Sequence, residues 1–467
     1  MDPFPADDLL LTSECETTEE EEDGQLDEQE EEEEQETVGW GLLPEVCLRR
    51  VFSFLQDCDR ARAALVCRHW LRVLHAPELW RARSFVFSGR AAKSRRADFQ
   101  SAVCYAKTFG RHLETLEIRF TNPVNSLTSR RFQQTLRTFL AVLRKDNSRL
   151  KSLSICCMEL DRPAWSRSVR NALVKSLSIF LRKAGHRLDN LNLRGARLGP
   201  LQGCELLESI AHQSGKSALS KLNIEDFFPQ ATAVYTLPAF AHALARFRNL
   251  SVLSLSYSCV SDSLLEALAA GCARTLGALH VRCHALEPHG QVVWGVAWAR
   301  LVQGCPRLRV NFSIERILHA DRLLRILLPE IPVRSLGLST CYFSEQDWTV
   351  KPVLTEVLPL FKDCLQKLIL DFNNSHESVD DELLQLILQC SKLSYLKVWA
   401  FLDVRFIETL LQHRLEGKCS LKTIKIRIYT NRYDTHEEDH LLEEFFTKYK
   451  ELIEKELSYF VISYPML

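Results

Sequence analysis

The residues best suited to chemistry in this chain are a cysteine and two histidines near its middle, Cys283, His284 and His289. Thiolate and imidazole groups bind zinc and serve as nucleophile and base. Their spacing is irregular and no fourth ligand follows, so we expect no metal site. Serine, histidine and aspartate are plentiful, but the chain has neither a GxSxG elbow nor a glycine-rich phosphate loop. The sequence therefore predicts no intrinsic catalysis, no metal and no cofactor.

The net charge of −1 over 467 residues hides a strong asymmetry. Residues 1–48 contain 19 Asp and Glu and no Lys or Arg, so the rest of the chain holds 59 basic and 41 acidic groups, a balance of +18. The run from Glu14 to Glu36 is too acidic to collapse, and we expect an acidic disordered tail over residues 1–38. It is either a solubilising tail or an electrostatic arm that competes with acidic ligands for the basic body.

Cysteine usage and hydropathy indicate the compartment. The 16 cysteines form no compact framework and no paired CxxC, which favours reduced thiols in the cytoplasm and/or the nucleus. No apolar leader and no run of eighteen apolar residues is present, so we expect neither a signal peptide nor a membrane partner.

Residues 42–81 predict short helices that cannot bury their own apolar surface. Pro44 opens the first helix, where its missing N–H costs no hydrogen bond. Apolar residues at helical spacing then mark two faces: Leu48, Val51, Phe52 and Leu55, followed by Val66, Trp70, Val73 and Leu74. A segment this short cannot build an independent core, so we expect a partner.

This segment resembles the F-box family. The family's Leu-Pro, Val-Phe-x-x-Leu, Val-Cys-x-x-Trp and Leu-Trp-Arg motifs fall in order on residues 43–44, 51–55, 66–70 and 79–81. The family usually has leucine where this chain has Arg60, and we expect one weakened packing contact there. The resemblance implies docking on the Skp adaptor of a cullin-RING (SCF) ubiquitin ligase. The docking residues that it implies are Leu43, Pro44, Val51, Phe52, Leu55, Val66, Cys67, Trp70, Leu79 and Trp80.

A Leu-x-x-Leu-x-Leu pattern fills the remainder of the chain. Copies begin at Leu113, Leu150, Leu188, Leu219, Leu250, Leu276, Val333, Leu365, Leu393 and Leu421, with a degraded copy at 308–312. The spacing, mostly 26 to 38 residues, accommodates one strand and one helix per repeat. In the copy at 250–276, we expect Cys259 at a buried turn and Ser261-Asp262 as the cap of a helix over 263–270. This pattern resembles the leucine-rich repeat of F-box proteins.

The expected fold is α/β: a short all-helical F-box followed by a leucine-rich-repeat solenoid, a horseshoe with parallel strands inside and helices outside. We expect an F-box over 40–82, a linker and solenoid cap over 83–112, repeats over 113–430 and a helical cap over 431–467.

Non-core strand positions would form the concave face and bind a substrate. The last two repeats are basic with one exposed aromatic, which suits an acidic or phosphorylated degron. The alternative, which the pattern slightly favours, is a solvated strand face without a ligand. The predicted substrate-binding residues are Arg282, Lys397, Trp399, Lys425 and Arg427.

The resemblance implies a non-catalytic substrate-recognition subunit that works with the Skp adaptor, cullin and RING subunit on an unidentified protein substrate. The RING subunit and its conjugating enzyme would transfer ubiquitin, and this chain would supply proximity. The alternative is a leucine-rich-repeat interaction scaffold outside a ligase, whose helices only cap the solenoid. Burial of Leu43, Pro44, Val66 and Trp70 would favour the cap, and exposure the docking face. Dispersed basic residues and the absence of an RNA-binding motif argue against a nucleic-acid partner.

Overall fold

The computed structural model describes residues 40, 43–55, 57–93, 95–211, 218–317, 319–339, 349–428 and 435–463. The chain divides into two compact units, Met1–His75 and Ala76–Leu467. The acidic stretch expected over residues 1–38 lies outside the described residues.

The first unit is helical. It contains α1 (Glu45–Phe54), α2 (Asp57–Ala63) and α3 (Arg68–Leu74). Helix α1 begins directly after Pro44, whose carbonyl accepts a hydrogen bond from Leu48 N at 3.1 Å. Helix α3 begins after Cys67, whose Sγ accepts from Trp70 N at 3.4 Å. The helix start predicted at Pro44 is confirmed, and the start of α3 has a local cause in the Cys67 side chain.

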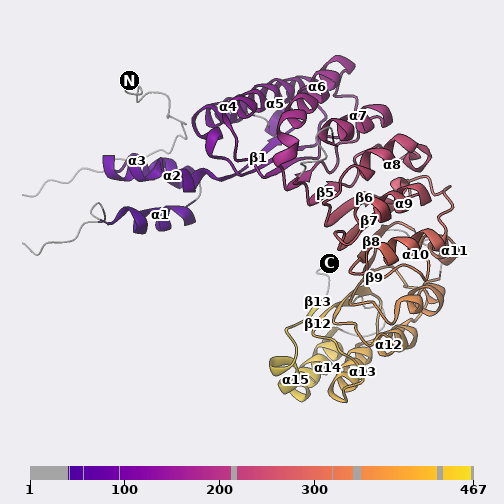
Figure 1. Cartoon of the computed structure of the whole chain (residues 1–467). Helices are drawn as coiled ribbons and strands as arrows, with labels where there is room; N and C mark the ends of the chain where they lie inside the picture. The colour runs from indigo at the N-terminus through magenta and orange to yellow at the C-terminus, as the bar shows by residue number, and fades with distance from the viewer. Residues whose placement is uncertain are drawn as a thin grey trace, which may run out of the picture. The chain divides into compact units, whose positions relative to one another are not determined.

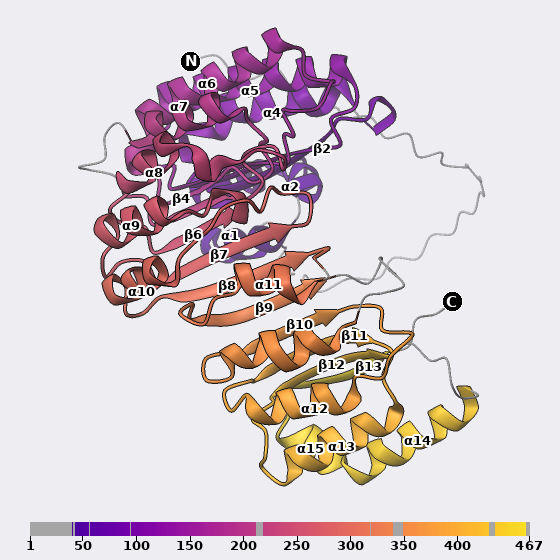
Figure 2. The same cartoon turned by 90° about the vertical axis from the view of Figure 1, so that its right-hand side faces the viewer.

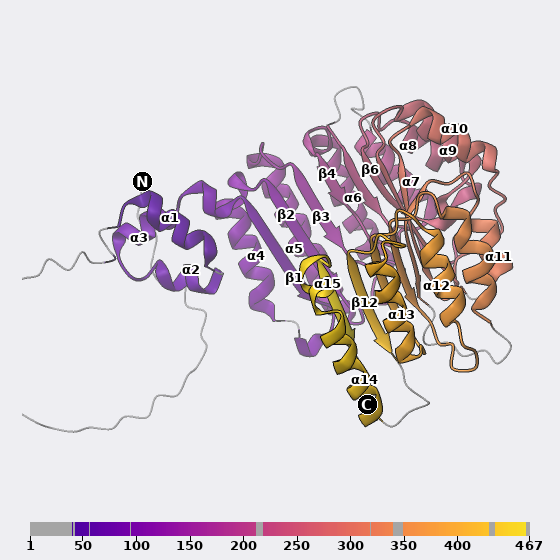
Figure 3. The ribbon, with the colours of Figure 1, turned by 90° about the horizontal axis from the view of Figure 1, so that it is seen from below.

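The second unit is built on a single sheet of thirteen parallel strands that pair in sequence order (Figure 3). The strands are β1 (Ala82–Ser88), β2 (Thr115–Thr121), β3 (Ser152–Cys156), β4 (Asn190–Asn192), β5 (Lys221–Ile224), β6 (Val252–Ser256), β7 (Ala278–His284), β8 (Arg309–Glu315), β9 (Val333–Ser339), β10 (Lys367–Asp371), β11 (Tyr395–Ala400), β12 (Thr423–Ile428) and β13 (Tyr459–Ser463). Sequential pairing of parallel strands joined by helices is the arrangement of a leucine-rich-repeat solenoid, and it confirms the predicted fold class.

Within the described part of the repeat unit, helices cover one face of this sheet and none lies on the other (Figures 1 and 2). They are α4 (Arg96–Phe109), α5 (Ser126–Asp146), α6 (Arg167–Ala184), α7 (Pro200–Ala211), α8 (Pro238–Ala245), α9 (Asp262–Gly271), α10 (Gly295–Gly304), α11 (Ala320–Ile326), α12 (Asp380–Gln389), α13 (Val404–Leu415), α14 (Thr435–Lys448) and α15 (Lys450–Lys455). The described residues between β9 and β10 form a π-helical turn, Val353–Val357, and a 3₁₀ turn, Leu358–Phe361. We call the uncovered side the inner face.

The repeat pattern determines which side of each strand is buried. The second and third apolar positions of the copy at Leu150 are Leu153 and Ile155, and both are fully buried beneath the helices. The residues between them face the opposite side because strand side chains alternate. In the copy at 250–276, Cys259 is buried, and Ser261 Oγ accepts from Leu264 N at 3.2 Å to cap α9. The predicted turn and cap are therefore confirmed.

The sheet also contains strands that the repeat pattern alone did not identify. Strand β1 lies in the segment expected as linker and cap, and β13 follows the helices expected at the C-terminus. The degraded copy at 308–312 forms a full strand, β8, with a register irregularity between Val310 and Asn311 where it meets β9. Among the described residues, no helix is both long and apolar enough to span a membrane.

Candidate binding surfaces

The helical unit exposes a group of large apolar side chains. We call this group, Trp40, Val46, Val51, Phe54, Leu65, Val66 and Leu71, the apolar surface. Val66 is 61% exposed and Phe54 72% exposed. Pro44 is exposed, and Leu43, Leu55, Cys67 and Trp70 are partly exposed. Water contact over so many apolar residues in so small a unit is typical of a protein-binding surface.

Phe52 belongs to the interior of this unit and not to its surface. Its side chain is fully buried, and its ring meets that of Trp70 edge to face with centroids 5.2 Å apart. The expectation that Phe52 contacts a partner is corrected, because the inward face of α1 carries Leu48 and Phe52 while Val51 points outward. Helix α1 carries apolar residues on more than one of its faces. This excess was the signal in the sequence that some of them, such as Val51, point outward.

Arg60 replaces the expected packing contact with hydrogen bonds. Its Nε donates to Phe52 O at 3.0 Å, and its Nη2 lies 3.4 Å from Ser53 O. Both carbonyls lie at the C-terminal end of α1, where backbone acceptors lack intrahelical partners and a cation is favoured. Arg60 therefore stabilises the end of α1.

Leu79 and Trp80 are part of the repeat unit, which begins at Ala76. Leu79 is buried, and Trp80 stacks on Phe109 of α4 at a centroid distance of 4.1 Å. Tyr105, on the same helix, meets Trp80 edge to face at 5.8 Å. The prediction that these residues line the docking surface is corrected. They anchor the start of the solenoid, because their stacked rings bury apolar area against α4, the first helix that covers the sheet.

The inner face carries a ladder of mostly polar residues in register. The pairing of β2 to β8 aligns Glu117, Ser154, Asn192, Asn223, Ser254, His280 and Asn311 at one level. Parallel neighbours are ~4.8 Å apart, so adjacent rungs are within side-chain reach. The positions on either side of each central leucine therefore form one continuous surface.

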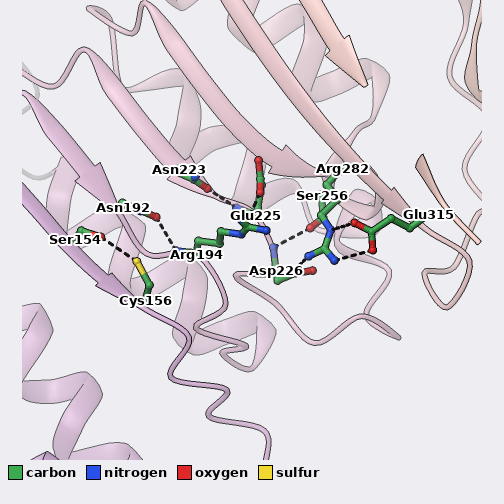
Figure 4. A network of polar contacts seen from close by, with 10 residues as sticks. All are labelled: Ser154, Cys156, Asn192, Arg194, Asn223, Glu225, Asp226, Ser256, Arg282 and Glu315. Atoms are coloured by element: carbon green, nitrogen blue, oxygen red, sulfur yellow. Dashed lines mark hydrogen bonds and ion pairs between the residues drawn. The ribbon is translucent and has the colours of Figure 1, made fainter. Parts of the chain in front are cut away.

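Arg282 lies in a network of charges on this surface (Figure 4). Its Nε donates to Glu315 Oε1 at 3.0 Å and its Nη2 to Glu315 Oε2 at 2.8 Å, while Nη1 contacts Asp226. Asp226 adopts a left-handed backbone conformation (φ 49°), and its N–H donates to Ser256 Oγ. The predicted role of Arg282 in substrate binding is corrected: two carboxylates already engage its guanidinium, so it serves as a cross-strand tie.

Two neighbouring cations, Arg119 on β2 and Arg194 just after β4, are also paired with carboxylates. Arg194 Nε lies 3.3 Å from Glu225 Oε2, and Arg119 Nη2 lies 2.8 Å from Glu117 Oε1. Burial raises the pKa of Glu225 and outweighs the lowering effect of the Arg194 and Arg282 charges. Each of these arginines therefore has a carboxylate partner on or beside its own strand, as Arg282 does.

The last four strands differ in their pairing. We call Lys367, Tyr395, Lys397, Trp399, Lys425, Arg427 and Tyr459 the aromatic–cation cluster. Lys397 Nζ lies 4.1 Å from the Trp399 ring centroid, and the Arg427 guanidinium lies 5.0 Å from the same ring. Lys425 Nζ lies 4.3 Å above Tyr459. Lys367 Nζ lies 4.6 Å above Tyr395. These seven residues come from β10 to β13 and share the inner face.

Register brings together four of the five predicted substrate residues, and Arg282 lies elsewhere. The pairing aligns Lys397 with Lys425 and Trp399 with Arg427. Sequence reasoning missed Lys367, Tyr395 and Tyr459. The first two occupy x positions of recognised repeats and were available to the same reasoning, whereas Tyr459 lies on β13, which has no leucine pattern.

The buried cysteine and histidines near β7 form a polar interior. Cys283 Sγ lies 3.3 Å from His289 Nε2, and Glu287 accepts hydrogen bonds from Ser258 N and His284 N. Burial raises the pKa of Glu287 to about 7 and, with the Arg322 charge, lowers that of His289 to about 4. Over the described ranges, no group of three or more His, Cys, Asp or Glu has the geometry to hold a metal ion.

Comparison with known proteins matches residues 40–86 to a family model described as F-box-like; the match covers the three helices and the first residues of the repeat unit. The chain is 25% identical to F-box/LRR-repeat protein 21 of Bos taurus over 370 residues, which cover 76% of each chain. It is 25% identical to F-box/LRR-repeat protein 8 of Homo sapiens over 301 residues, covering 64% of this chain and 74% of the relative. The chain therefore has an F-box-like domain and is homologous to F-box/LRR-repeat proteins.

A looser likeness exists to a solved structure titled "Crystal structure of Rad7 and Elc1 complex in yeast". It has a TM-score of 0.41 and 15% sequence identity, and covers 83% of this chain and 88% of that chain. The overlap carries no argument about function.

Proposed function

We propose that this chain is the substrate-recognition subunit of an SCF-type ubiquitin ligase. Its F-box-like domain would dock on the Skp adaptor and thereby on cullin and the RING subunit, and its inner face would hold a protein substrate. The observation that carries the proposal is the apolar surface of the helical unit, in which Val66 is 61% exposed and Pro44 is exposed. Exposure at these positions favours a docking face over a solenoid cap.

The chain's contribution would be positional and non-catalytic. A receptor holds a substrate lysine near a charged thioester that other subunits carry, and this proximity raises the effective concentration of the reacting groups. The inner face suits that task because rigid strands fix its side chains. We propose a cytoplasmic or nuclear location, supported by thirteen cysteines that are free thiols in the described part of the chain.

A narrower assignment rests on sequence likeness outside the helices. We propose that segments such as HGQVVWGVAWARL (289–301) resemble F-box only protein 39. The relatives that the comparisons found are F-box/LRR-repeat proteins. We propose to use this resemblance when choosing which candidate substrates to test. The second candidate function is an interaction scaffold outside a ligase, in which the inner face binds partners but no adaptor is recruited.

Co-purification with the Skp adaptor and cullin tests the proposal. Wild-type chain should co-elute with both, and the Leu43→Ala/Pro44→Ala variant should not, while circular dichroism shows an intact fold. The Val124→Ala/Leu127→Ala variant is a matched control, because these residues are 59% and 64% exposed on the repeat unit. Failure of the wild-type protein to co-elute would favour the scaffold.

A further inference from the structure

The aromatic–cation cluster holds positive charge that the protein itself does not neutralise. Among the described residues, no carboxylate lies within ion-pair distance of Lys367, Lys397, Lys425 or Arg427, whereas Arg119, Arg194 and Arg282 are all paired. The Nε of Arg427 is buried and has no hydrogen-bond partner in the described part of the chain. Uncompensated charge therefore lies at the β10–β13 end of the inner face.

Aromatic rings hold these cations in place. Each Lys or Arg of the cluster lies 4.1 to 5.0 Å from a ring centroid of Tyr395, Trp399 or Tyr459. A contact of this kind contributes about 0.5 to 1 kcal/mol at an exposed site. It also limits the rotamers of long side chains before a ligand arrives, which reduces the entropy lost on binding. The cluster is thus preorganised for an anionic partner.

The spread of the cations distinguishes among anionic partners. Lys397 and Lys425 are paired neighbours, Arg427 lies two residues further along β12, and Lys367 pairs with Tyr395 one level before. With strands ~4.8 Å apart and ~3.3 Å per residue, the Cα atoms of Lys367 and Arg427 are ~16 Å apart. A single phosphate group is far smaller than this span. Several carboxylates along an extended segment match it.

We propose that the inner face of β10–β13 binds an extended protein segment carrying several acidic residues. The carboxylates of that segment would pair with Lys367, Lys397, Lys425 and Arg427, and the aliphatic parts of its side chains would contact the aromatic rings. This inference rests on the proposed role of the inner face as a substrate surface and specifies the substrate class. Asp371 marks one limit of the surface, since it pairs with Trp399 in register and accepts from Ser339 Oγ at 3.2 Å. Acidic side chains should avoid that position.

The test uses the full chain bound to the Skp adaptor and a labelled oligoglutamate peptide at low and physiological salt. The expected result is measurable binding that weakens with salt, and no binding of the oligoglutamine peptide of the same length. The Lys397→Glu/Lys425→Glu variant should bind about tenfold more weakly or not at all, because reversal replaces attraction with repulsion. The peptide should change the intrinsic fluorescence of the wild-type chain but not of Trp399→Phe.

The control variant is Arg137→Glu/Lys175→Glu, which makes the same change in net charge at exposed positions of α5 and α6. It should bind the peptide as tightly as the wild type does. An equal loss of affinity in both variants would overturn the proposal, because net charge alone would then explain the binding. Tighter binding of a peptide with one phosphoserine, or of single-stranded RNA, would also overturn it. Adaptor co-elution in the same preparation separates the two claims: no peptide binding with co-elution intact refutes this inference alone.

Discussion

Replacement of Arg282 by methionine should destabilise the repeat unit and leave acidic-peptide binding intact in protein that stays folded. The substitution removes a guanidinium that donates to Glu315 and contacts Asp226, and methionine offers no donor in return. The Asp226 side chain is 10% exposed and that of Glu315 is 32% exposed. Two carboxylates would then face each other partly desolvated.

The magnitude follows from this exposure. Loss of one partner of a fully buried ion pair costs about 3 to 5 kcal/mol, and the partial exposure of Glu315 places the cost near the lower limit, about 3 kcal/mol. That is a large share of a domain stability of about 5 to 15 kcal/mol. Arg300→Met is the matched control. Arg300 lies 2.7 Å from Glu266, but both side chains are more than half exposed, so its cost should be about 0 to 1 kcal/mol.

The assay is urea denaturation followed by circular dichroism, with both midpoint and slope compared because repeat arrays can unfold in segments. Burial of Glu315 opposes its ionisation, but Arg282 outweighs that effect and lowers the folded-state pKa below the ordinary value. The stability from this pairing is therefore present above the unfolded pKa and lost as pH falls through the folded pKa. The Arg282→Met penalty should shrink on acidification below about pH 4.5.

Equal midpoints for Arg282→Met and the wild type would refute the structural role assigned to this arginine. Loss of peptide binding with unchanged stability would restore the substrate role predicted from the sequence.

Other substitutions test the helical unit and the polar interior. Phe52→Ala should cost about 3 to 5 kcal/mol in the F-box-like unit, whereas Val66→Asp should leave its circular dichroism unchanged and abolish adaptor co-elution. Wild-type melting temperature after Phe52→Ala would contradict the burial assignment. For Glu287, the raised folded pKa of about 7 means that the folded state keeps a proton that the unfolded state has lost, so its contribution to stability falls as pH rises from about 4.5 to above 7. The free energy of unfolding of Glu287→Gln, relative to that of the wild type, should therefore increase by the order of 3 kcal/mol between pH 5 and pH 8. His284 and His289 are present in both proteins, so their titration does not contribute to this difference. A difference that does not change with pH would contradict the assignment.

The sequence determined the elements whose causes are local or periodic. Leu-x-x-Leu-x-Leu copies identify buried strand positions because alternation fixes which side chains face the helices, and even the degraded copy at 308–312 forms a strand. Ser261 caps α9 through a contact three residues along the chain. The same local and periodic patterns predicted that helices precede the sheet in the chain. They also predicted that Lys397 and Lys425 lie on the inner face.

The tertiary structure decided which charges are free. Arg282 and Arg427 occupy equivalent ladder positions in the sequence. The carboxylate partners of Arg282, however, lie 56 and 33 residues away along the chain, and only the strand register brings them within reach. The same dependence on register places Tyr459 beside Lys425 and completes the aromatic–cation cluster. Packing of α1 against α3 likewise turned Phe52 inward and left Val51 outside. Pairing and burial are properties of neighbours in space, and a pattern of spacing along one chain does not specify those neighbours.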